Sequence, residues 1–395
     1  NTKKIVELVK KKGVANAGKQ IVAIASSTGG PKSLQSVIPR LPENLDAPVV
    51  LVQHMPSGFT KSMAERLDSL SALHVKEAQE GDEVKKGTLI ATPTGLGANI
   101  FSSVYGVVEE IKEDRIVIKP DAEQKDEFVP IEEGSKLDMV KAAGVVGMGG
   151  AGFPTGIKVS ADLTGGYVLV NAAECEPGLK HNIKQLEEQT DITIRGLKYC
   201  MEICNAAKGI IALKKKNEKA VEILRAAIKD DDSLTIHLLP DIYPMGEERA
   251  VVRETLGIEL EPTQLPAAAK SIVINVETLA RVAEAIDERK PSFSKNLTVV
   301  GKIKGGNKPH VFMDVPVGTS VGELIEMAGG LDGEVGEIVM GGPFTGKATT
   351  LDAPITKTTG GIIPTIEFPD LHGATMGLLV CACGGVGAAP MLPIA

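Results

Sequence analysis

The chain has 395 residues, of which 43% are hydrophobic and 24% are charged, which predicts two or three globular domains and no general disorder. A formal net charge of -8, with 3% aromatic residues and no Trp, argues against a nucleic-acid partner, because phosphates are repelled and bases find few rings to stack on. No apolar run approaches the roughly 20 residues of a membrane helix, and no signal-peptide core follows the Lys-rich start, so a cytoplasmic protein without a transmembrane segment is expected.

The first part of the chain alternates apolar strands with amphipathic helices. The expected strands are residues 20–25, 47–53 and 72–78, and the expected helices are residues 31–41 and 58–70. Such alternation is typical of a parallel sheet covered by helices. Residues 1–79 are therefore predicted to form a Rossmann-like αβα fragment.

Residues 80–120 consist of short strands interrupted by Gly and Pro, which predicts a small β module. The turn at residues 81–87 (Gly-Asp-Glu-Val-Lys-Lys-Gly) resembles that of biotinyl- and lipoyl-type sandwich domains. The family places a carrier lysine in the facing hairpin, which is residues 102–106 here and contains no lysine. A structural β-sandwich of the barrel-sandwich hybrid type is therefore expected, without a carrier role.

The rest of the chain is predicted to contain a linker, two further domains and a tail. Residues 121–139 are acidic and are expected to be the linker. Residues 140–290 again alternate strands and helices, which predicts a second Rossmann-like domain. Residues 291–344 show a ββαβ order of β-grasp appearance, as in SLBB domains. Residues 345–395 are expected to be a loop-rich tail, in which residues 345–365 are rich in Thr, Gly and Pro and are expected to be loop. The predicted fold class is multidomain α/β.

Residues 147–152 (Gly-Met-Gly-Gly-Ala-Gly) form the most informative segment. Glycines at this density let the backbone N–H groups approach an anion, and a nearby lysine supplies the opposite charge. Alone, the segment fits a plain tight turn equally well. The candidate binding residues here are Gly147, Gly149, Gly150, Gly152 and Lys158.

Three later segments place polar residues where α/β sheets bind ligands. The strand at residues 168–170 runs into an amide and two carboxylates, and beyond a strand's carboxyl end is the usual ligand position. The other two segments are residues 243–248, at a helix start, and residues 274–280. The candidate residues in these segments are Asn171, Glu174, Glu176, Tyr243, Gly246, Glu247, Glu248, Asn275 and Thr278.

These four motifs, in this order, resemble the NADH-binding flavoprotein subunit of respiratory complex I and, more closely, the C subunit of the Rnf complex. With residues 93–100 and 135–140, the chain looks most like the Rnf-C-like electron-transfer protein that accompanies D-proline reductase. The resemblance covers about residues 81–385. It implies FMN and NADH as cofactors, hydride transfer from NADH to the flavin, and onward electron transfer to a partner reductase or iron-sulfur protein. The resemblance is also compatible with peripheral association with a membrane complex.

Carried over by residue, the resemblance assigns roles to all the candidates. The glycines and Lys158 hold the FMN phosphate and ribityl chain, and Asn275 and Thr278 contact the phosphate. The residues beside the flavin and ribose are Asn171, Glu174 and Glu176, and those flanking the nicotinamide and isoalloxazine are Tyr243, Gly246, Glu247 and Glu248. Two structural alternatives to these binding roles stay open. Glu247 and Glu248 could instead stabilise the start of a helix, and Asn275 could be a hydrogen-bonded turn residue.

The five cysteines are too few and odd in number for a disulfide framework. Cys200 and Cys204 lie four apart on an expected helix, which favours small core residues over a redox pair. Cys381 and Cys383 are the better redox or iron-sulfur candidates, but no C-x-x-C-x-x-C run exists. An iron-sulfur cluster is therefore doubtful, and no firm metal site is expected.

A second family resemblance occupies residues 20–78. Residues 24–31 (Ile-Ala-Ser-Ser-Thr-Gly-Gly-Pro) and 52–56 (Val-Gln-His-Met-Pro) resemble the catalytic domain of chemotaxis protein-glutamate methylesterase. This resemblance implies Ser27 as the nucleophile and His54 as its base. The family's orienting Asp lies in a Gly-Met-Gly-x-Asp-Gly motif, whereas residues 147–152 lack it, so the triad is incomplete.

The leading functional interpretation is flavin-linked electron transfer from NADH. The alternatives are ester hydrolysis on methylated receptor glutamates and a non-catalytic docking scaffold. Because the two families meet near residues 81–84, the chain is interpreted as a chimera, whether a natural fusion, an engineered one or an artefact.

Overall fold

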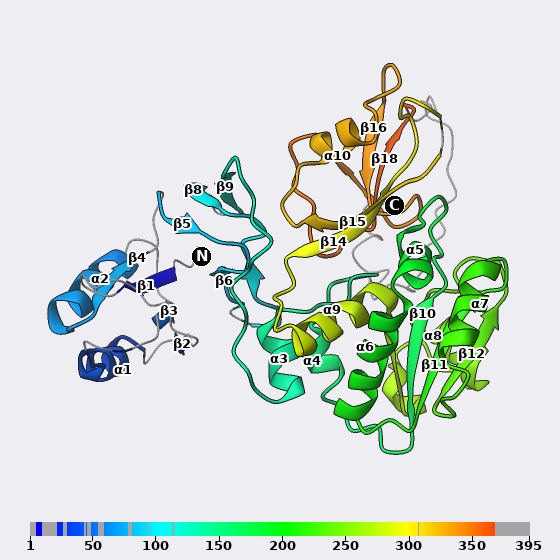
Figure 1. The fold of residues 1–395 in the computed structure, drawn as a ribbon, viewed down its shortest axis with the longest axis horizontal. Coiled ribbons are helices and arrows are strands. Elements are labelled where there is room, and N and C mark those ends of the chain that lie inside the picture. Colours follow the sequence, from blue (N-terminus) through cyan, green and yellow to red (C-terminus); the bar gives the residue numbers. More distant parts are fainter. Residues whose placement is uncertain are drawn as a thin grey trace. The chain divides into compact units, whose positions relative to one another are not determined.

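The computed structural model describes residues 5–9, 22–26, 30–42, 45, 49–53, 59–77, 81–93, 95–112, 114–306 and 308–367 (Figure 1). These residues divide into two compact units. The first unit lies within Asn1–Gly134 and Arg289–Phe293, and the second within Ser135–Glu288 and Ser294–Ala395. In the described part of the chain, no helix has both the length and the apolar character needed to cross a membrane.

The first unit begins with a four-stranded sheet in the order β2-β3-β1-β4. Its strands are β1 (Ile5–Val9), β2 (Val22–Ser26), β3 (Val49–Gln53) and β4 (His74–Glu77), and its helices are α1 (Gly30–Val37), η1 (Ile38–Arg40) and α2 (Phe59–Leu70). The core contains Leu34, Ile38, Leu51 and Leu67, all buried. The sheet is mixed and not parallel as expected, because β1 pairs antiparallel with both β3 and β4.

The rest of the first unit is a set of short antiparallel strands. They are β5 (Glu83–Val84), β6 (Leu89–Ala91), β7 (Ile100–Phe101), β8 (Gly106–Ile111) and β9 (Ile116–Pro120). The order is β5-β8-β9 in one sheet and β6-β7 in another. Ser102, in the hairpin where a carrier lysine would stand, is 1% exposed and donates to the Val104 carbonyl at 2.8 Å, so this turn is buried structure.

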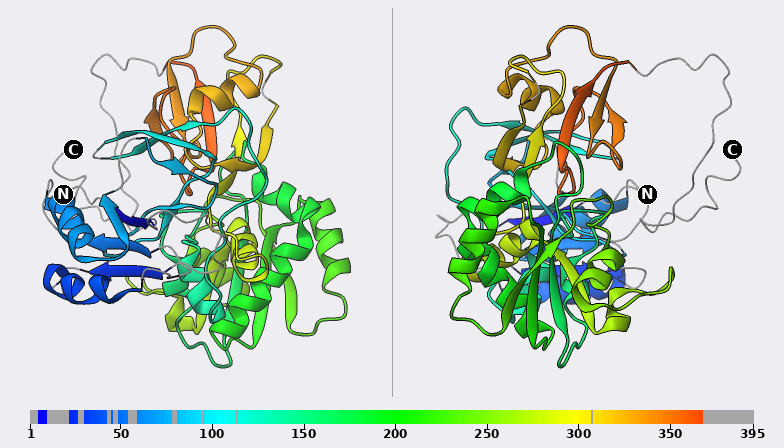
Figure 2. Two further views of the ribbon diagram at one scale, coloured as in Figure 1. Left: turned by 60° about the vertical axis from the view of Figure 1, so that its left-hand side comes forward. Right: turned by 90° about the vertical axis from the view of Figure 1, so that its right-hand side faces the viewer.

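The second unit is built on a four-stranded parallel sheet in the order β12-β11-β10-β13. The strands are β10 (Tyr167–Ala172), β11 (Lys208–Lys214), β12 (Leu234–Leu239) and β13 (Ser271–Asn275). Most residues of strands β10 and β13 are buried, as expected in a parallel sheet with helices on both faces (Figure 2).

Helices cover the sheet and complete this α/β part. They are α3 (Lys136–Ala142), α4 (Thr155–Lys158), α5 (His181–Glu188), α6 (Thr190–Ile203), α7 (Glu218–Ala227), α8 (Glu248–Leu256), η2 (Pro266–Ala269) and α9 (Val276–Asp287). Gly196 of α6 lets α9 approach closely, since a Cβ there would lie 1.9 Å from the Leu279 carbonyl oxygen. Cys200 and Cys204 are buried free thiols, which confirms them as core residues.

A five-stranded mixed sheet follows, in the order β15-β14-β18-β16-β17. The strands are β14 (Ser294–Val299), β15 (His310–Pro316), β16 (Glu337–Met340), β17 (Lys347–Thr349) and β18 (Gly361–Thr365), with helix α10 (Val321–Met327). Its core includes Leu297, Leu324 and Ile362. The expected loop at residues 345–365 is wrong in part, because two of the strands lie there and β18 is the central one.

Candidate functional site

The strand order of the parallel sheet reverses between β10 and β13. β11 and β12 continue on one side of β10, whereas β13 lies on its other side. In open α/β sheets, ligands bind beyond the carboxyl ends of the strands at such a reversal. Asn171 and Asn275 are paired directly across it, so two of the predicted residues lie at the expected position of a ligand.

The glycine-rich segment, residues 147–152, forms a closed loop. The Gly147 N–H donates to the Phe153 carbonyl at 2.9 Å. Gly152 has φ +73°, a left-handed conformation that glycine adopts without strain. A Cβ added at Gly150 would meet no atom within 4 Å, so the chain leaves space beside the loop.

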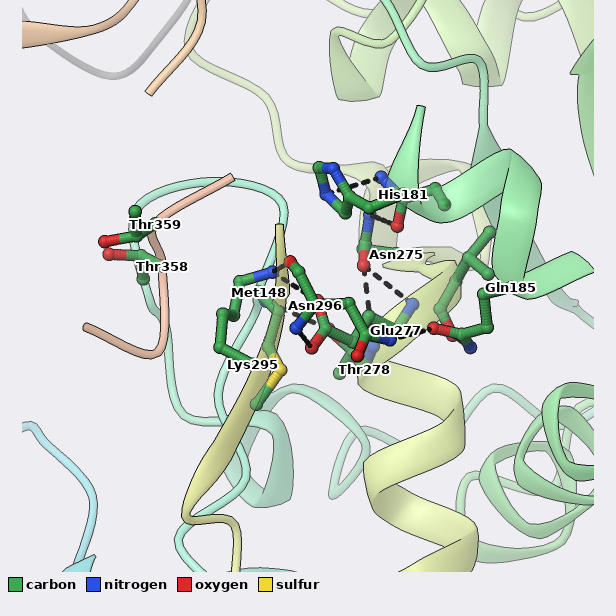
Figure 3. Close-up of polar contacts among 12 residues, drawn as sticks. Met148, His181, Gln185, Asn275, Glu277, Thr278, Lys295, Asn296, Thr358 and Thr359 are labelled. Carbon is green, nitrogen blue, oxygen red and sulfur yellow. Dashed lines mark hydrogen bonds and ion pairs between the residues drawn. The ribbon is translucent and has the colours of Figure 1, made fainter. Parts of the chain in front are cut away.

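The loop is anchored to the beginning of α9. The Met148 N–H donates to the Thr278 hydroxyl at 3.0 Å, and this hydroxyl donates to the Val146 carbonyl at 3.3 Å. A Cβ at Gly149 would lie 2.6 Å from Asn275 Nδ2, so only glycine allows this approach. The structure thus brings the first and last of the four motifs into contact (Figure 3).

Asn275 connects this loop to the second motif. Its Oδ1 accepts from the N–H groups of Glu277 and Thr278 at 2.9 and 3.4 Å, so Asn275 caps α9. Its Nδ2 donates to Asn182 Oδ1 at 3.2 Å, and the Asn182 N–H donates to the Glu174 carboxylate at 2.8 Å. Burial raises the pKa of Glu174, although the Asn182 hydrogen bonds act in the opposite direction.

Asn171 connects the second motif to the third. Its Nδ2 donates to the Gly246 carbonyl at 2.8 Å, and the Gly246 N–H donates to Cys175 Sγ at 2.7 Å. Glu247 accepts from the Arg249 N–H at 3.0 Å and is the N-cap of α8. The alternative role of Glu247 as a helix-start residue therefore matches its geometry.

A cavity of about 320 Å³ lies beside these residues. This is at the lower end of the roughly 300–1,000 Å³ range of small-molecule sites. The part of the lining that bears on chemistry is Glu174, Cys175, Glu176, Lys214, Tyr243 and Phe344. The cavity therefore combines carboxylates, lysines and two aromatic rings.

The five-stranded sheet contributes one wall of this cavity. The Glu176 carboxylate accepts from the Phe344 N–H at 2.9 Å and from the Thr345 hydroxyl at 2.7 Å. The rings of Tyr243 and Phe344 have centroids 4.6 Å apart and are tilted by 57°. No sequence motif pointed to Phe344, because its role depends on a contact between distant segments.

Lys158 is the predicted residue that lies apart from the loop contacts. Its ammonium pairs with Glu248 at 2.6 Å and donates to the Val273 carbonyl at 3.0 Å. Both predicted residues, Lys158 and Glu248, are thus engaged with each other. The positive charge of this lysine is largely neutralised within the chain.

A buried charge network joins α9 to the five-stranded sheet. Glu277 and Lys295 are both 0% exposed and form an ion pair, and the Asn296 N–H donates to Glu277 at 2.6 Å. Arg281 contacts Glu277 at 3.3 Å and is also buried. Burial lowers the pKa of Lys295, and Glu277 partly offsets this. Sequence reasoning missed these residues, since lysine and glutamate usually signal an exposed surface.

Four predicted residues lie outside the described part of the chain. They are Ser27, His54, Cys381 and Cys383. Among the described residues, no cluster of three or more His, Cys, Asp or Glu side chains could hold a metal ion.

The described residues fit FMN, the cofactor that the sequence resemblance implies. A phosphate needs space that is free of side chains, and Gly150 borders such a space, since a Cβ there would meet no atom within 4 Å, whereas the space at Gly149 is taken by Asn275. The ring system needs a half-apolar slot, and the cavity beside Tyr243 offers one. These are the residues that would hold the cofactor.

Comparison with known proteins agrees with this arrangement. Residues 140–284 match the Nuo51 FMN-binding domain family, and these residues contain all four motifs. A cobalamin reductase PduS from Salmonella typhimurium is 39% identical over 227 residues, covering 57% of this chain and 49% of that protein. The C subunit of the proton-translocating ferredoxin:NAD(+) oxidoreductase complex of Clostridium ljungdahlii is 33% identical over 308 residues, covering 72% of this chain and 66% of that protein.

The larger part of the chain is Rnf-C-like. The chain spans about half the length of the PduS relatives that it matches. A solved structure, an NAD+-reducing NiFe hydrogenase in the air-oxidized state, superposes with a TM-score of 0.50 at 25% identity, covering 58% of this chain and 46% of that one. The α/β fold with a parallel sheet thus has a neighbour among solved structures, in an NAD+-reducing hydrogenase.

A second family is present in the same chain. Residues 22–124 match the CheB methylesterase family. This match covers most of the first unit and extends through β5 to β9, beyond the alternating segment that carried the sequence resemblance. The chain therefore joins a methylesterase-like part to the Rnf-C-like region.

Proposed function

We propose that the second unit binds FMN and accepts hydride from NADH, and that it passes electrons to a protein partner. The observation that carries this proposal is the contact of the glycine-rich loop with Asn275 and Thr278 at the reversal of strand order. Loops with bare backbone at this position commonly bind phosphate-bearing cofactors. The family match over residues 140–284 supports the choice of FMN.

Different residues are expected at the phosphate end and at the ring end of the FMN site. The loop backbone and the Thr278 hydroxyl are expected to hold the phosphate end, because they meet beside open space at Gly150. Tyr243 is expected to lie beside the ring because it lines the cavity. Asn171 is expected there because its Nδ2 donates to the carbonyl of Gly246, in the same motif as Tyr243. When bound, FMN supplies the two-electron to one-electron conversion, and the protein supplies orientation.

The carboxylates of the cavity have a different expected role. Glu176 lines the cavity and is held by main-chain and hydroxyl donors from the five-stranded sheet. A carboxylate in this position can exchange those donors for the ribose hydroxyls of a dinucleotide. The exposed rings of Tyr243 and Phe344 border the same space, where they are expected to pack against an aromatic ring of the bound cofactors.

We propose a redox protein or iron-sulfur protein as the electron acceptor. Similar proteins are named as subunits of ferredoxin:NAD(+) oxidoreductase complexes, which supports a redox partner and peripheral membrane association. In the same framework, the five-stranded sheet is assigned to the β-grasp SLBB type and the β5 to β9 strands to the barrel-sandwich hybrid type. Cys381 and Cys383 remain candidates for onward transfer.

An anaerobic titration tests the proposal. Purified full-length protein is titrated with FMN and then with NADH, and flavin absorbance is followed. Binding with bleaching by NADH is the expected result. Gly149→Ala should weaken FMN binding, because its Cβ would lie 2.6 Å from Asn275 Nδ2, whereas Gly95→Ala, which meets nothing within 4 Å, should not. A protein that binds no flavin would contradict the proposal.

Ester hydrolysis is the second candidate, and the match of residues 22–124 favours it. The test is methanol release from methylated receptor glutamates, with Ser27→Ala as the inactive variant. Release that Ser27→Ala abolishes would establish this activity. Partner capture without flavin binding and without methanol release would favour the docking scaffold instead.

A further inference from the structure

Three strand ends of the parallel sheet bring charged side chains to one cavity. Glu176 follows the end of β10, Lys214 is the last residue of β11, and Asp241 follows the end of β12. All three residues line the cavity of about 320 Å³. Figure 1 shows the three strands side by side in the sheet. Because ligands bind beyond the carboxyl ends of parallel strands, these charges lie where a ligand is expected.

Two lysines of the cavity converge on one carboxylate. The ammonium of Lys214 lies 3.0 Å from Oδ1 of Asp241, and that of Lys216 lies 2.8 Å from its Oδ2. Hydrogen bonds from Lys216 and Lys214 hold the pKa of Asp241 below its ordinary value, so this carboxylate is ionised. A third lysine, Lys180, is exposed and lines the same cavity. The lysines therefore carry more positive charge than Asp241 neutralises.

The other carboxylates of the cavity are held by different donors. Glu174 accepts from the Asn182 N–H at 2.8 Å, and Glu176 accepts from the Phe344 N–H at 2.9 Å. Asp241 is therefore the carboxylate of the cavity lining that pairs with its lysines. The cavity thus has a lysine-rich part around Asp241 and a separate carboxylate at Glu176.

The partners of this ion-paired group differ in burial. The side chain of Lys214 is 6% exposed, whereas that of Asp241 is 49% exposed. A buried ammonium needs an anion beside it, because an unpaired buried charge is costly. A half-exposed carboxylate can turn into water with little loss, because ion pairs of exposed groups are weak. A phosphate can therefore take the place of Asp241, since lysine binds phosphate as a point charge.

We propose that Lys180, Lys214 and Lys216 form the subsite for the diphosphate of the nicotinamide dinucleotide, and that Asp241 holds this position until the dinucleotide binds. This inference rests on the proposed function and deepens it, because Glu176 of the same cavity is expected to bind the ribose hydroxyls. The bound diphosphate replaces Asp241 as the partner of Lys214 and Lys216. Since the contacts are between charges, binding weakens as the salt concentration rises.

Calorimetric titration of the full-length protein with ADP-ribose tests the subsite, because ADP-ribose has the diphosphate and lacks the nicotinamide. Lys216→Met should lower the ADP-ribose affinity roughly tenfold, as expected for a hydrogen bond between charged groups. Asp241→Asn should raise the affinity, because the lysines lose the carboxylate that competes with the diphosphate. The matched control is Lys215→Met, since Lys215 is exposed and lies outside the described lining of the cavity. This control should bind ADP-ribose as wild type does.

Flavin bleaching gives a second measurement on the same variants. NADH is compared with dihydronicotinamide riboside, which delivers hydride but has no phosphate. Lys216→Met should need roughly tenfold more NADH for half-maximal bleaching and the same amount of the riboside as wild type. A variant that merely disturbs the fold would need more of both.

The outcomes separate this inference from the proposed function. Wild type that binds neither FMN nor ADP-ribose overturns both. Wild type that binds FMN, with equal ADP-ribose affinity in Lys216→Met, overturns this inference alone. Asp241→Asn that binds ADP-ribose no more tightly than wild type also overturns it, because the ion pairs are then structural. Where circular dichroism shows that Lys216→Met is unfolded, Lys180→Met replaces it, and unchanged ADP-ribose affinity in that variant overturns the subsite.

Discussion

Replacing Glu277 with Gln should destabilise the second unit, because it removes the negative charge from a fully buried ion pair. Glu277 and Lys295 are both 0% exposed, and Glu277 also accepts from the Asn296 N–H at 2.6 Å. In this variant Arg281 still pairs with Glu284 at 2.8 Å. The charge left without its partner is therefore the ammonium of Lys295. Removing one partner of a buried pair costs roughly 3–5 kcal/mol.

Thermal unfolding followed by circular dichroism at pH 7 measures this loss. For a unit of roughly 150–250 residues, a loss of this size lowers Tm by roughly 6–20 °C. The matched control is Glu187→Gln, whose partner Lys219 lies at 2.6 Å with a side chain 68% exposed. Exposed pairs contribute roughly 0–1 kcal/mol, so the control should melt within a few degrees of wild type.

The double variant Glu277→Gln with Lys295→Met gives the decisive comparison. It removes both charges, so it should be more stable than Glu277→Gln alone. The reasoning fails if Glu277→Gln melts within the range of the Glu187→Gln control, or if removing the lysine from Glu277→Gln destabilises the protein further.

The other predictions concern the loop, the buried lysine and the cavity. Thr278→Val should weaken FMN binding and cost roughly 1–3 kcal/mol of stability, because the Met148 N–H loses its acceptor; unchanged binding and melting would contradict this. Lys357→Met should raise the Tm of the flavin-free protein at pH 6, where the folded amine, with its pKa lowered to about 7 from 10.5, is still charged and burial costs up to roughly 5 kcal/mol. Between pH 7 and 10.5 the folded chain releases this proton while the unfolded chain keeps it, so wild-type stability rises with pH. The difference in Tm between Lys357→Met and wild type should therefore vanish over this range, and a difference that does not change with pH would contradict the lowered pKa of Lys357. Glu176→Gln should slow the bleaching of the flavin by NADH in stopped-flow measurements and leave the FMN affinity unchanged. If the bleaching rate and the FMN affinity fall by the same factor, Glu176 contacts the flavin instead.

Local sequence patterns predicted some features of the structure correctly and others wrongly. Asn275 follows an apolar strand and precedes a helix in the sequence, and the structure has it as the cap of α9 at the carboxyl edge of the sheet. Residues 345–365 show the opposite case. Their Thr, Gly and Pro content predicted a loop, yet Gly361–Thr365 is a strand, because pairing with β14 and β16 outweighs the weak preference of a five-residue segment.

Two lysines of the site also show that local sequence patterns do not predict contacts between distant segments. Lys158 lies six residues beyond the glycine-rich loop in the sequence, but its ammonium faces Glu248 on another helix. Lys357 lies far away in the sequence, but its ammonium contacts the carbonyl at the base of that loop. Proximity along the chain was therefore a poor guide to which cation stands near the loop.

The sequence by itself determined the alternation of strands and helices in the second unit, the backbone freedom of residues 147–152 and the order of the four motifs. These follow from the side-chain period and from glycine's lack of a Cβ, which are local properties. Only the tertiary structure decided that β13 lies beside β10, which brings Asn275 to Asn171, and that Lys357 and Phe344 reach the site from the five-stranded sheet. Neighbouring strands are selected by packing across the whole core, and a strand's own period does not specify its neighbour.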